Sequence, residues 1–227
     1  MSLQVVVMAA GLGTRLRPLT DDVAKPVLPI DGQPVLGRLL RELAAAGCSS
    51  VTLVTGHLAE QVERLAGDGS AFGVHVRVVG QPSPDGSADA VRRAGLEPPY
   101  VAVAADTVFG SGDLGRFAAA FADGAGAAGA IAIRRHPGKV GVRVADGRVT
   151  RVRDPDADRS AAPLWGIRQP VHERLCIDRR PHELSVAFQA AIDAGGDVMA
   201  VPIGRTRDLT QPLDLLEQNF PYLRAIR

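Results

Sequence analysis

The chain has 227 residues, a length that suits one α/β domain with a sizeable buried core. Its 26 basic and 25 acidic side chains leave a formal net charge of +1, so no global field favours nucleic acid or an anionic membrane as a partner. Aromatic residues make up only 4% of the chain, which argues against stacking of bases along a single strand.

Strand-like apolar runs alternate with helix-like segments in the first half of the chain. Residues 3–10 are expected to form a buried strand; this run is too short for an export signal or a membrane span, so we expect a cytoplasmic protein. Residues 34–46 are expected to form a helix, because Pro34 suits a first turn and Gly47 suits the stop. The alternation predicts further strands and helices, in chain order, at Val51–Thr55, Ala59–Ala66, Val74–Val79, Ser87–Ala94, Tyr100–Ala105 and Leu114–Ala122.

The second half of the chain is less regular. The Gly/Ala-rich residues 123–130 are compatible with a flexible loop, whereas Ile131–Ile133 is expected to be a strand. An Asp-Gly turn signal between Val140–Val144 and Arg148–Val152 predicts a hairpin, and the polar residues 153–163 are expected to form a surface loop. We expect a helix at Pro181–Ala194, a strand at Val198–Ile203 and a helix at Leu213–Asn219.

Repeated β-α-β units predict a mostly parallel sheet with helices on both faces. No linker or internal repeat is visible, so we expect a single domain over residues 1–227 in which the hairpin region forms a small lobe facing the substrate. In such sheets, ligands bind outside the carboxyl ends of the strands where the strand order reverses. The turn at Gly11–Arg15 and the side chain of Asp106 both follow predicted strands, which makes them candidates for a site.

The most informative segment runs from Val5 to Ile30. The first apolar run ends in Gly11-Leu12-Gly13-Thr14-Arg15, and Lys25-Pro26 follows shortly after. Backbone N–H groups in a glycine turn can face an anion without obstruction, and Arg15 and Lys25 add full positive charge, so the segment is suited to a triphosphate. A dinucleotide fingerprint would need a third glycine where Leu16 stands, and the Gly-Lys-Ser/Thr end of a P-loop is absent.

The pattern G-x-G-T-R-L-x-P-L-T followed by K-P-x-x-P-I resembles the signature of the sugar-1-phosphate nucleotidylyltransferases. The resemblance implies a Rossmann-like, three-layer nucleotidyltransferase fold with a hairpin-containing sugar-binding lobe. It implies that Arg15 and Lys25 are catalytic and that the turn binds the nucleotide through Ala10, Gly11, Gly13 and Thr14.

Two aspartates match the positions at which this family binds Mg²⁺. Asp106 ends a predicted strand, as in the family's Gly-Asp, although the glycine is Ala105 here. Asp208 stands in a segment similar to the family's W-x-D-x-G-T-P-x-D-L-L ending. This chain has lost the aromatic residue and the glycine of that pattern. Mg²⁺ prefers oxygen ligands and needs only one or two carboxylates beside substrate phosphates, so both assignments are chemically reasonable.

The resemblance also assigns residues to the base and to the acceptor. Gln81 and Gly86 match the family's base-reading segment, and the Gln81 amide can offer both a donor and an acceptor to an imide edge. Gly141 and Trp165 match strands that contact the sugar in relatives. The family's Glu-Lys-Pro, which holds the sugar and its phosphate, is Arg153-Asp154-Pro155 here, with both charges reversed.

The expected activity is Mg²⁺-dependent transfer of a nucleoside monophosphate from a nucleoside triphosphate, preferably UTP or dTTP, to a sugar-1-phosphate with release of pyrophosphate. The reversed Arg153-Asp154 pair keeps two alternatives open. One is cytidylyl or other nucleotidyl transfer to a non-sugar phosphate or phosphonate. The other is a non-catalytic nucleotide-binding domain of the same fold. The expected partners are therefore small phosphorylated molecules rather than nucleic acid or membrane, and an oligomer is compatible with the sequence.

Overall fold

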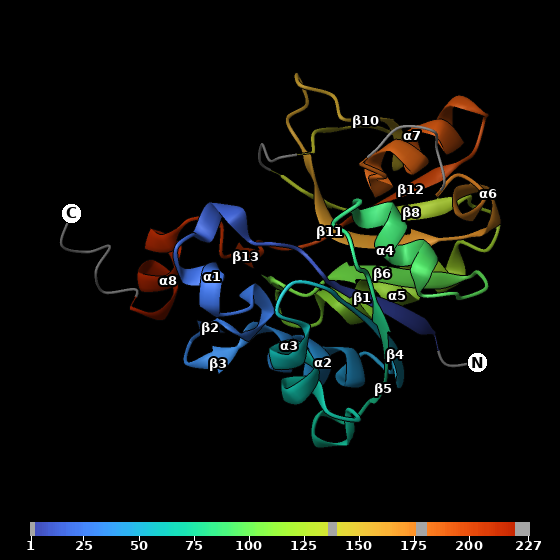
Figure 1. The fold of residues 1–227 in the computed structure, drawn as a ribbon. Helices are drawn as coiled ribbons and strands as arrows, with labels where there is room; N and C mark the ends of the chain where they lie inside the picture. Colours follow the sequence, from blue (N-terminus) through green and yellow to red (C-terminus); the bar gives the residue numbers. More distant parts are fainter. Residues whose placement is uncertain (1–2, 136–139, 176–180, 221–227) are drawn as a thin grey trace.

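A nine-stranded sheet forms the centre of the computed structural model, which describes residues 3–135, 140–175 and 181–220 (Figure 1). Strands β10 and β11 run against the other strands of this sheet, which share one direction. The strands lie side by side in the order β5 (His75–Gly80), β4 (Ser50–Thr55), β1 (Gln4–Ala9), β6 (Tyr100–Ala104), β11 (Ser160–Ile167), β8 (Gly129–Arg134), β12 (Val198–Pro202), β10 (Arg148–Val152) and β9 (Val142–Ala145).

Strand β1 is enclosed on all sides. It pairs in parallel with β4 on one edge and β6 on the other, so that Val5 lies between Val51 and Val101. Val5 and Val7 belong to the hydrophobic core on one face of the sheet and Val6 to the core on the other. A strand buried on both faces needs a continuous run of β-branched residues rather than an alternating pattern, as the sequence provides here.

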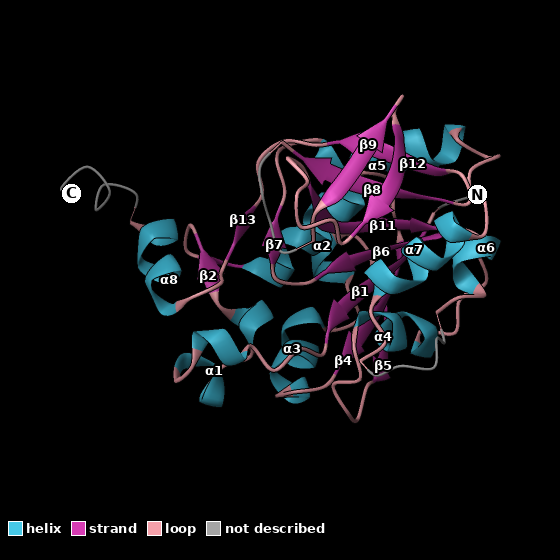
Figure 2. Cartoon of the chain, turned by 90° about the horizontal axis from the view of Figure 1, so that it is seen from above, coloured by secondary structure: helices cyan, strands magenta, loops and turns pink. Residues whose placement is uncertain are grey.

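Helices cover both faces and make the predicted three-layer fold (Figures 1 and 2). One layer contains α2 (Val35–Ala45), α3 (Ala59–Ala66) and α5 (Asp113–Asp123), whose apolar side chains lie in one core. The other contains α4 (Ser87–Arg93), α6 (Gln169–His172) and α7 (Leu184–Asp193). The leucines of α2 recur every three or four residues, and this spacing turns Leu36, Leu39, Leu40 and Leu43 toward the sheet.

Several short elements gather beside the carboxyl ends of the strands. Two small antiparallel pairs form there: β2 (Pro29–Ile30) with β3 (Gln33–Pro34), and β7 (Thr107–Val108) with β13 (Arg207–Asp208). Helices α1 (Leu19–Asp22) and α8 (Pro212–Asn219) and the 3₁₀ turns Thr14–Leu16, Lys25–Val27 and Ser70–Phe72 complete the described elements. A third, smaller core that includes Leu16, Ile30, Val108 and Leu209 joins the pieces near the glycine turn.

Three expectations about the second half need correction. The predicted loop over residues 153–163 ends early, because β11 begins at Ser160 and its first residues are buried. The Gly/Ala-rich segment already enters β8 at Gly129. Helix α7 begins at Leu184 rather than at Pro181, since the backbone of His182 is bonded to the loop before α4 and to the first turn of α4. Its N–H donates to the carbonyl oxygen of Asp85 and its own carbonyl oxygen accepts from the N–H of Ala88, each at 2.7 Å.

The predicted hairpin is present as β9 and β10, paired antiparallel around Asp146-Gly147. It is continuous with the main sheet, because β10 also pairs with β12. Within the described ranges, no helix is long and apolar enough to cross a lipid bilayer.

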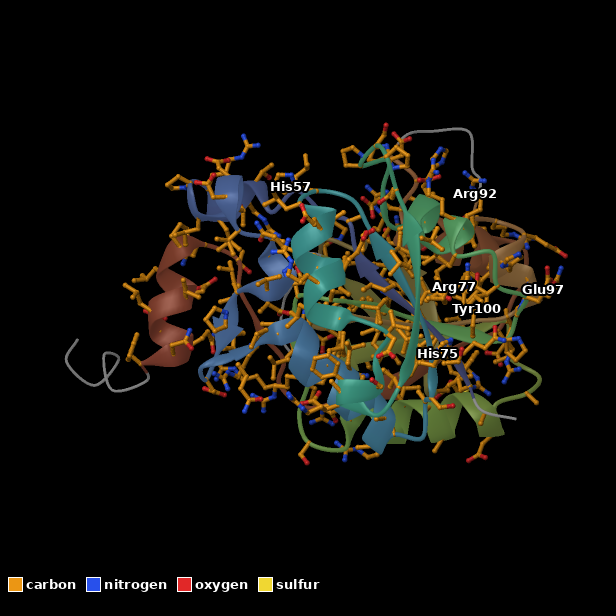
Figure 3. The ribbon with its side chains drawn as sticks, turned by 60° about the horizontal axis from the view of Figure 1, so that its bottom comes forward. His57, His75, Arg77, Arg92, Glu97 and Tyr100 are labelled. Carbon is orange, nitrogen blue, oxygen red and sulfur yellow. The ribbon has the colours of Figure 1, made fainter. Side chains whose placement is uncertain are left out.

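Helix α4 is fixed to the sheet at its C-terminal end. Arg77 on β5 donates to the carbonyl oxygen of Ala94 at 2.5 Å and to the Thr52 hydroxyl at 3.2 Å (Figure 3). Ala94 directly follows the last residue of α4 and is fully buried. The position of α4 matters below, because its first turn borders the candidate site.

We expect Asp113→Asn to lower the free energy of unfolding by about 1–3 kcal/mol, the cost of mismatching a buried hydrogen-bonding group. The Asp113 carboxylate is fully buried and accepts hydrogen bonds from the backbone N–H groups of Gly110 and Gly204, so it joins α5 to the loop after β12. An amide would turn its own N–H groups toward these donors or leave one donor unpaired. Urea unfolding measures the change.

Asp123→Asn is the matched control, because Asp123 is an exposed residue at the end of the same helix. Equal stability of the two variants would show that Asp113 is not the anchor inferred here.

Candidate active site at the carboxyl ends of β1 and β6

The strand order reverses between β1 and β6. From β1 the chain proceeds through α2 to β4 and through α3 to β5, moving outward along one side, and then returns to place β6 on the other side of β1. A cavity of about 420 Å³ opens at this point. The residues that line it include Ala10, Gly11, Gly13, Thr14, Arg15, Lys25, Gln81, Gly86 and Asp106. The structure thus brings the predicted nucleotide, catalytic and first metal residues together, as expected at a topological switch point.

The glycine turn has the geometry of an anion cradle. Gly13 has φ 65°, and a Cβ atom there would lie 2.8 Å from Cγ2 of Thr20, so glycine is required. The Thr20 hydroxyl donates to the Gly13 carbonyl oxygen at 2.9 Å and holds the turn closed. Among the described residues, no acceptor is found for the backbone N–H groups of residues 11–15. A run of unpaired N–H groups beside a cavity suits phosphate oxygens.

Two basic side chains line the cavity beside this turn. Arg15 is exposed on the 3₁₀ turn, whose buried neighbour Leu16 anchors it to the small core. Lys25 forms an ion pair with Asp106, which lies just beyond β6. The side chain of Lys25 is largely buried while that of Asp106 remains about a third exposed. The pair therefore holds the ammonium group at the cavity wall and leaves part of the carboxylate accessible to a ligand.

Asp208 lies beside Asp106 but does not line the cavity. Register pairs it with Thr107, whose hydroxyl donates to Asp208 Oδ1 at 2.6 Å and lies 3.4 Å from Asp106 Oδ1. Asp208 Oδ2 accepts from Arg134 at 3.1 Å, so the second carboxylate is already paired with a cation. Arg134, at the end of β8, is a neighbour that the sequence pattern did not reveal.

The donor set fits a hard cation only when substrate oxygens complete it. The carboxylates of Asp106 and Asp208 are both partly exposed, and the Thr107 hydroxyl contacts both of them. Mg²⁺ commonly binds one or two such carboxylates together with phosphate oxygens of the substrate. Over the residues that the structure describes, no group of three or more His, Cys, Asp or Glu side chains forms an all-protein metal site.

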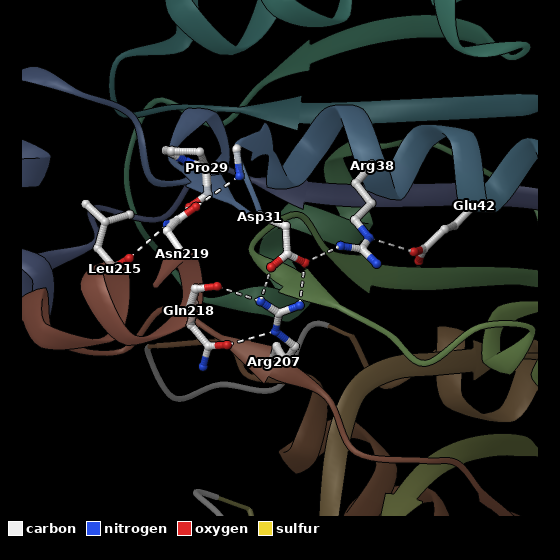
Figure 4. A network of polar contacts seen from close by, with 9 residues as sticks. Pro29, Asp31, Arg38, Glu42, Arg207, Leu215, Gln218 and Asn219 are labelled. Atoms are coloured by element: carbon white, nitrogen blue, oxygen red, sulfur yellow. Dashed lines mark hydrogen bonds and ion pairs between the residues drawn. The ribbon is translucent and has the colours of Figure 1, made fainter. Parts of the chain in front are cut away.

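A polar network fixes the segment that carries Asp208 (Figure 4). Arg207 makes two hydrogen bonds to Asp31 in the β2–β3 turn, at 2.5 and 2.8 Å, and two more to Gln218 on α8. The hydrogen bond from Arg207 is the main reason that the pKa of Asp31 is lowered. Arg38 on α2 donates to the same carboxylate at 3.1 Å. Strand β13 is thus tied to three other elements, so the position of Asp208 is set by the fold.

Gln81 and Gly86 also line the cavity. Gln81 is 6% exposed, and its Nε2 donates to the Gly86 carbonyl oxygen at 3.1 Å and to Asp89 Oδ2 at 2.9 Å. Gly86 has φ 103°, and a Cβ atom there would lie 2.4 Å from the carbonyl oxygen of His182. The expectation that the Gln81 amide offers both donor and acceptor is corrected, because its two N–H groups are already used within the protein.

Asp89, behind Gln81, is an ionised buried group that the sequence analysis did not identify. Burial acts to raise its pKa, but hydrogen bonds from Gln81, Arg93 and Arg92 outweigh this and lower the pKa to about 2. Its contribution to stability is therefore present above the ordinary pKa near 3.8 and is lost as the pH falls toward 2.

The predicted acceptor residues lie away from the cavity lining. Asp154 is buried: its Oδ1 accepts from the N–H of Asp156 at 3.1 Å, which lowers its pKa, and its Oδ2 pairs with Arg143 at 2.7 Å. Arg153 is exposed with φ 62°. A Cβ atom on Gly141 would lie 1.9 Å from the Asp154 carbonyl oxygen, so this glycine admits the protein's own backbone.

Trp165 is a core residue in this structure. It is 6% exposed and contacts Phe188 of α7, with 5.0 Å between the ring centroids. Trp165 was expected to contact the acceptor, but its ring lies in the hydrophobic core and is not part of the cavity wall.

Three polar residues of the cavity wall were missed in the sequence. Ser87 and Glu183 lie together, since the Ser87 hydroxyl donates to Glu183 Oε2 at 2.5 Å and accepts from the Leu184 N–H at 2.9 Å. Thr210 follows β13, and its N–H donates to Asp214 Oδ2 at 2.6 Å. Glu183 is remote in sequence from the other residues of the cavity wall. It reaches the cavity because the backbone of His182 lies against Gly86 and because Ser87 donates a hydrogen bond to Glu183.

We expect Gly141→Ala to lower the free energy of unfolding by about 1–3 kcal/mol, as overpacking does, and to leave nucleotide binding unchanged. The added methyl group would displace the backbone of Asp154 rather than a ligand. Gly126→Ala is the control, because no atom lies within 4 Å of a Cβ there. Thermal unfolding and nucleotide titration measure both effects. If the Gly141→Ala variant kept its full stability but lost affinity for the acceptor, the assignment of Gly141 to the acceptor site would be supported instead.

Comparison with known proteins agrees with this geometry. A family model described as "Nucleotidyl transferase" matches residues 4–154. Two glucose-1-phosphate thymidylyltransferases, from Streptomyces antibioticus and Streptomyces griseus, are 33% and 30% identical over 99% and 96% of this chain. The chain spans 67% and 65% of their lengths, about two thirds in each case.

A solved UDP-glucose pyrophosphorylase from Acinetobacter baumannii superposes with a TM-score of 0.81 at 19% identity, covering 100% of this chain and 99% of its own. At this identity the likeness concerns the fold alone. The chain belongs to the nucleotidyl transferase family, among the sugar-1-phosphate nucleotidylyltransferases.

Proposed function

We propose that this chain transfers a nucleoside monophosphate from UTP or dTTP to a sugar-1-phosphate and releases pyrophosphate. One observation carries the proposal: a cavity at the switch point joins unpaired backbone N–H groups, two basic side chains and an accessible carboxylate. The names of the two Streptomyces relatives support the same reaction class.

The proposed reaction exchanges one P–O bond for another. An anionic oxygen of the acceptor phosphate forms a bond to the α-phosphorus. The bond from this phosphorus to the bridging oxygen breaks, and pyrophosphate leaves with the electron pair. Because both reactants are anions, the protein must offset their repulsion and the charge that develops on the leaving group.

The residues divide this work by position. The N–H groups of residues 11–15 and the Arg15 guanidinium would hold the oxygens of the leaving pyrophosphate. Lys25, fixed by Asp106, would face the α-phosphate, where one P–O bond forms and the other breaks. The Thr20 hydroxyl keeps the turn closed, so that these groups are in place before the substrate arrives.

Asp106 and Asp208 would hold Mg²⁺ together with phosphate oxygens. When bound, the cation would screen the charge between the two phosphates. In the ligand-free protein, Lys25 forms an ion pair with Asp106 and Arg134 forms one with Asp208, and these contacts hold both carboxylates in position.

Glu183 is the residue we propose for the acceptor in place of the family's glutamate. It lines the cavity, and Ser87 orients its carboxylate, which can accept hydrogen bonds from sugar hydroxyls. Asp154 is the less suitable group because Arg143 already pairs with it and it lies outside the cavity lining.

Pyrophosphate release from UTP, dTTP or CTP, with a panel of hexose-1-phosphates, phosphocholine and a phosphonate as acceptors, tests the proposal. The expected result is release with UTP or dTTP and a hexose-1-phosphate. Release only with a non-sugar acceptor would favour nucleotidyl transfer of another kind, and nucleotide binding without any release would favour a non-catalytic domain.

We expect Asp106→Asn to reduce turnover by at least about 100-fold, the scale on which a charge contact in the transition state contributes. The amide would release Lys25 and is a poor ligand for a hard cation. Turnover measured against Mg²⁺ concentration checks this, with Arg15→Ala and Lys25→Ala expected to show comparable losses. The exposed Asp123→Asn variant is the control. Undiminished turnover of Asp106→Asn at limiting Mg²⁺ would refute the metal assignment.

A further inference from the structure

The orientation of the Gln81 amide is fixed by its surroundings. Both Nε2 hydrogens are used, one by the Gly86 carbonyl oxygen and one by Asp89 Oδ2. Turning the amide by half a turn would place its oxygen against these two acceptors. Neither a carbonyl oxygen nor an ionised carboxylate can donate, so the turned state would lose both hydrogen bonds.

Asp89 is itself held as an acceptor. It is 3% exposed, and its Oδ2 also accepts from Arg93 Nε at 2.6 Å. Its Oδ1 accepts from Arg92 at 2.9 Å, and Figure 3 shows Arg92 in the region of α4. Two guanidinium groups beside a buried carboxylate keep it ionised. Asp89 therefore has no proton to offer to Gln81.

Only the Oε1 atom of the Gln81 amide remains for a ligand. Within the described parts of the chain, this oxygen has no hydrogen-bond partner, and the N–H of Gly86 likewise has no acceptor. Both residues line the cavity. The wall thus offers one acceptor and one donor within a single short turn.

This pair matches a base that carries an N–H next to a C=O. Uracil and thymine present such an edge, at N3–H and an adjacent carbonyl, and guanine presents N1–H beside O6. Cytosine presents the reverse, an acceptor at N3 beside an amino donor at N4. A fixed acceptor would therefore face the N3 lone pair of cytosine, which leaves both groups without a partner.

We propose that Asp89 is a specificity-determining positioning residue: it locks the Gln81 amide with its oxygen toward the cavity and thereby selects uracil and thymine nucleotides over cytosine nucleotides. Asp89 does not itself line the cavity and acts through Gln81. This inference rests on the proposed function, because it assigns the Gln81 end of the cavity to the base.

The test compares UTP and CTP in wild type and in Asp89→Asn. An amide at this position can donate as well as accept, so the variant removes one of the two contacts that oppose the turned orientation of Gln81 and leaves only the Gly86 carbonyl oxygen against it. We expect the ratio of kcat/KM for UTP to that for CTP to fall at least about tenfold in the variant. Dissociation constants for both nucleotides, measured with Mg²⁺ by calorimetry, should show the same direction of change.

Two further variants separate specificity from stability. Asp113→Asn removes another fully buried carboxylate that is paired with an arginine three residues later, and it should leave the UTP to CTP ratio unchanged. Asp89→Ser also removes the obligate acceptor and introduces a smaller side chain, so it serves if Asp89→Asn does not fold. If Asp89 had a merely structural role, its substitution would lower the melting temperature and reduce kcat/KM for UTP and for CTP by the same factor.

The outcomes distinguish this inference from the proposed function. A folded Asp89 variant with the wild-type UTP to CTP ratio would overturn the inference, and so would a wild type that prefers CTP. If the wild type bound UTP with a preference over CTP but released no pyrophosphate, the proposed function would fail while the calorimetric ratios still tested Asp89. If it bound no nucleoside triphosphate, both would fall.

Discussion

The central constraint of this structure is the enclosure of β1. Its N–H and C=O groups are paired with β4 and β6 on both edges, and its side chains are buried on both faces. When the chain leaves the sheet after Ala9, it loses these partners at once, and the glycine turn provides none for the N–H groups of residues 11–15. Unpaired donors at a cavity wall are costly unless water or a ligand satisfies them. The fold therefore places unpaired N–H donors at the edge of the sheet where β6 leads into Asp106, and our proposal assigns the phosphates to these donors.

The rest of the site is built from ion pairs between side chains. Lys25 pairs with Asp106 and Arg134 with Asp208, while Thr107 contacts both carboxylates. Each ion pair holds its two side chains in place, so that a nucleotide and its cation would meet a preorganised arrangement of charges. The Arg207–Asp31 contact extends this support to α8 and the β2–β3 turn (Figure 4). At the Gln81 end of the cavity, Asp89 holds the Gln81 amide by a hydrogen bond, as Asp106 holds Lys25 by an ion pair.

The sequence predicted the parallel half of the fold and grouped most of the residues that line the cavity, because both depend on local patterns. The run at Val5–Val7 and the leucines of α2 show their burial in their spacing, and the residue types of the Gly11–Arg15 turn indicate a candidate site. The acceptor side could not be predicted in this way. Whether Asp154 faces a ligand depends on Arg143 and the Gly141 backbone, and Glu183 reaches the cavity only because α7 contacts the loop at Gly86. Such long-range contacts leave no periodicity in the sequence, so single motifs could not show which of these residues line the cavity.

The most direct test of this account is a crystal structure of the protein with Mg²⁺ and a non-hydrolysable UTP analogue. The account predicts that the triphosphate lies against the N–H groups of residues 11–15 and Arg15, that the cation contacts Asp106, and that uracil N3–H donates to Gln81 Oε1. A nucleotide bound elsewhere on the protein, or in this cavity with its base at the glycine turn and its phosphates at Gln81, would contradict it.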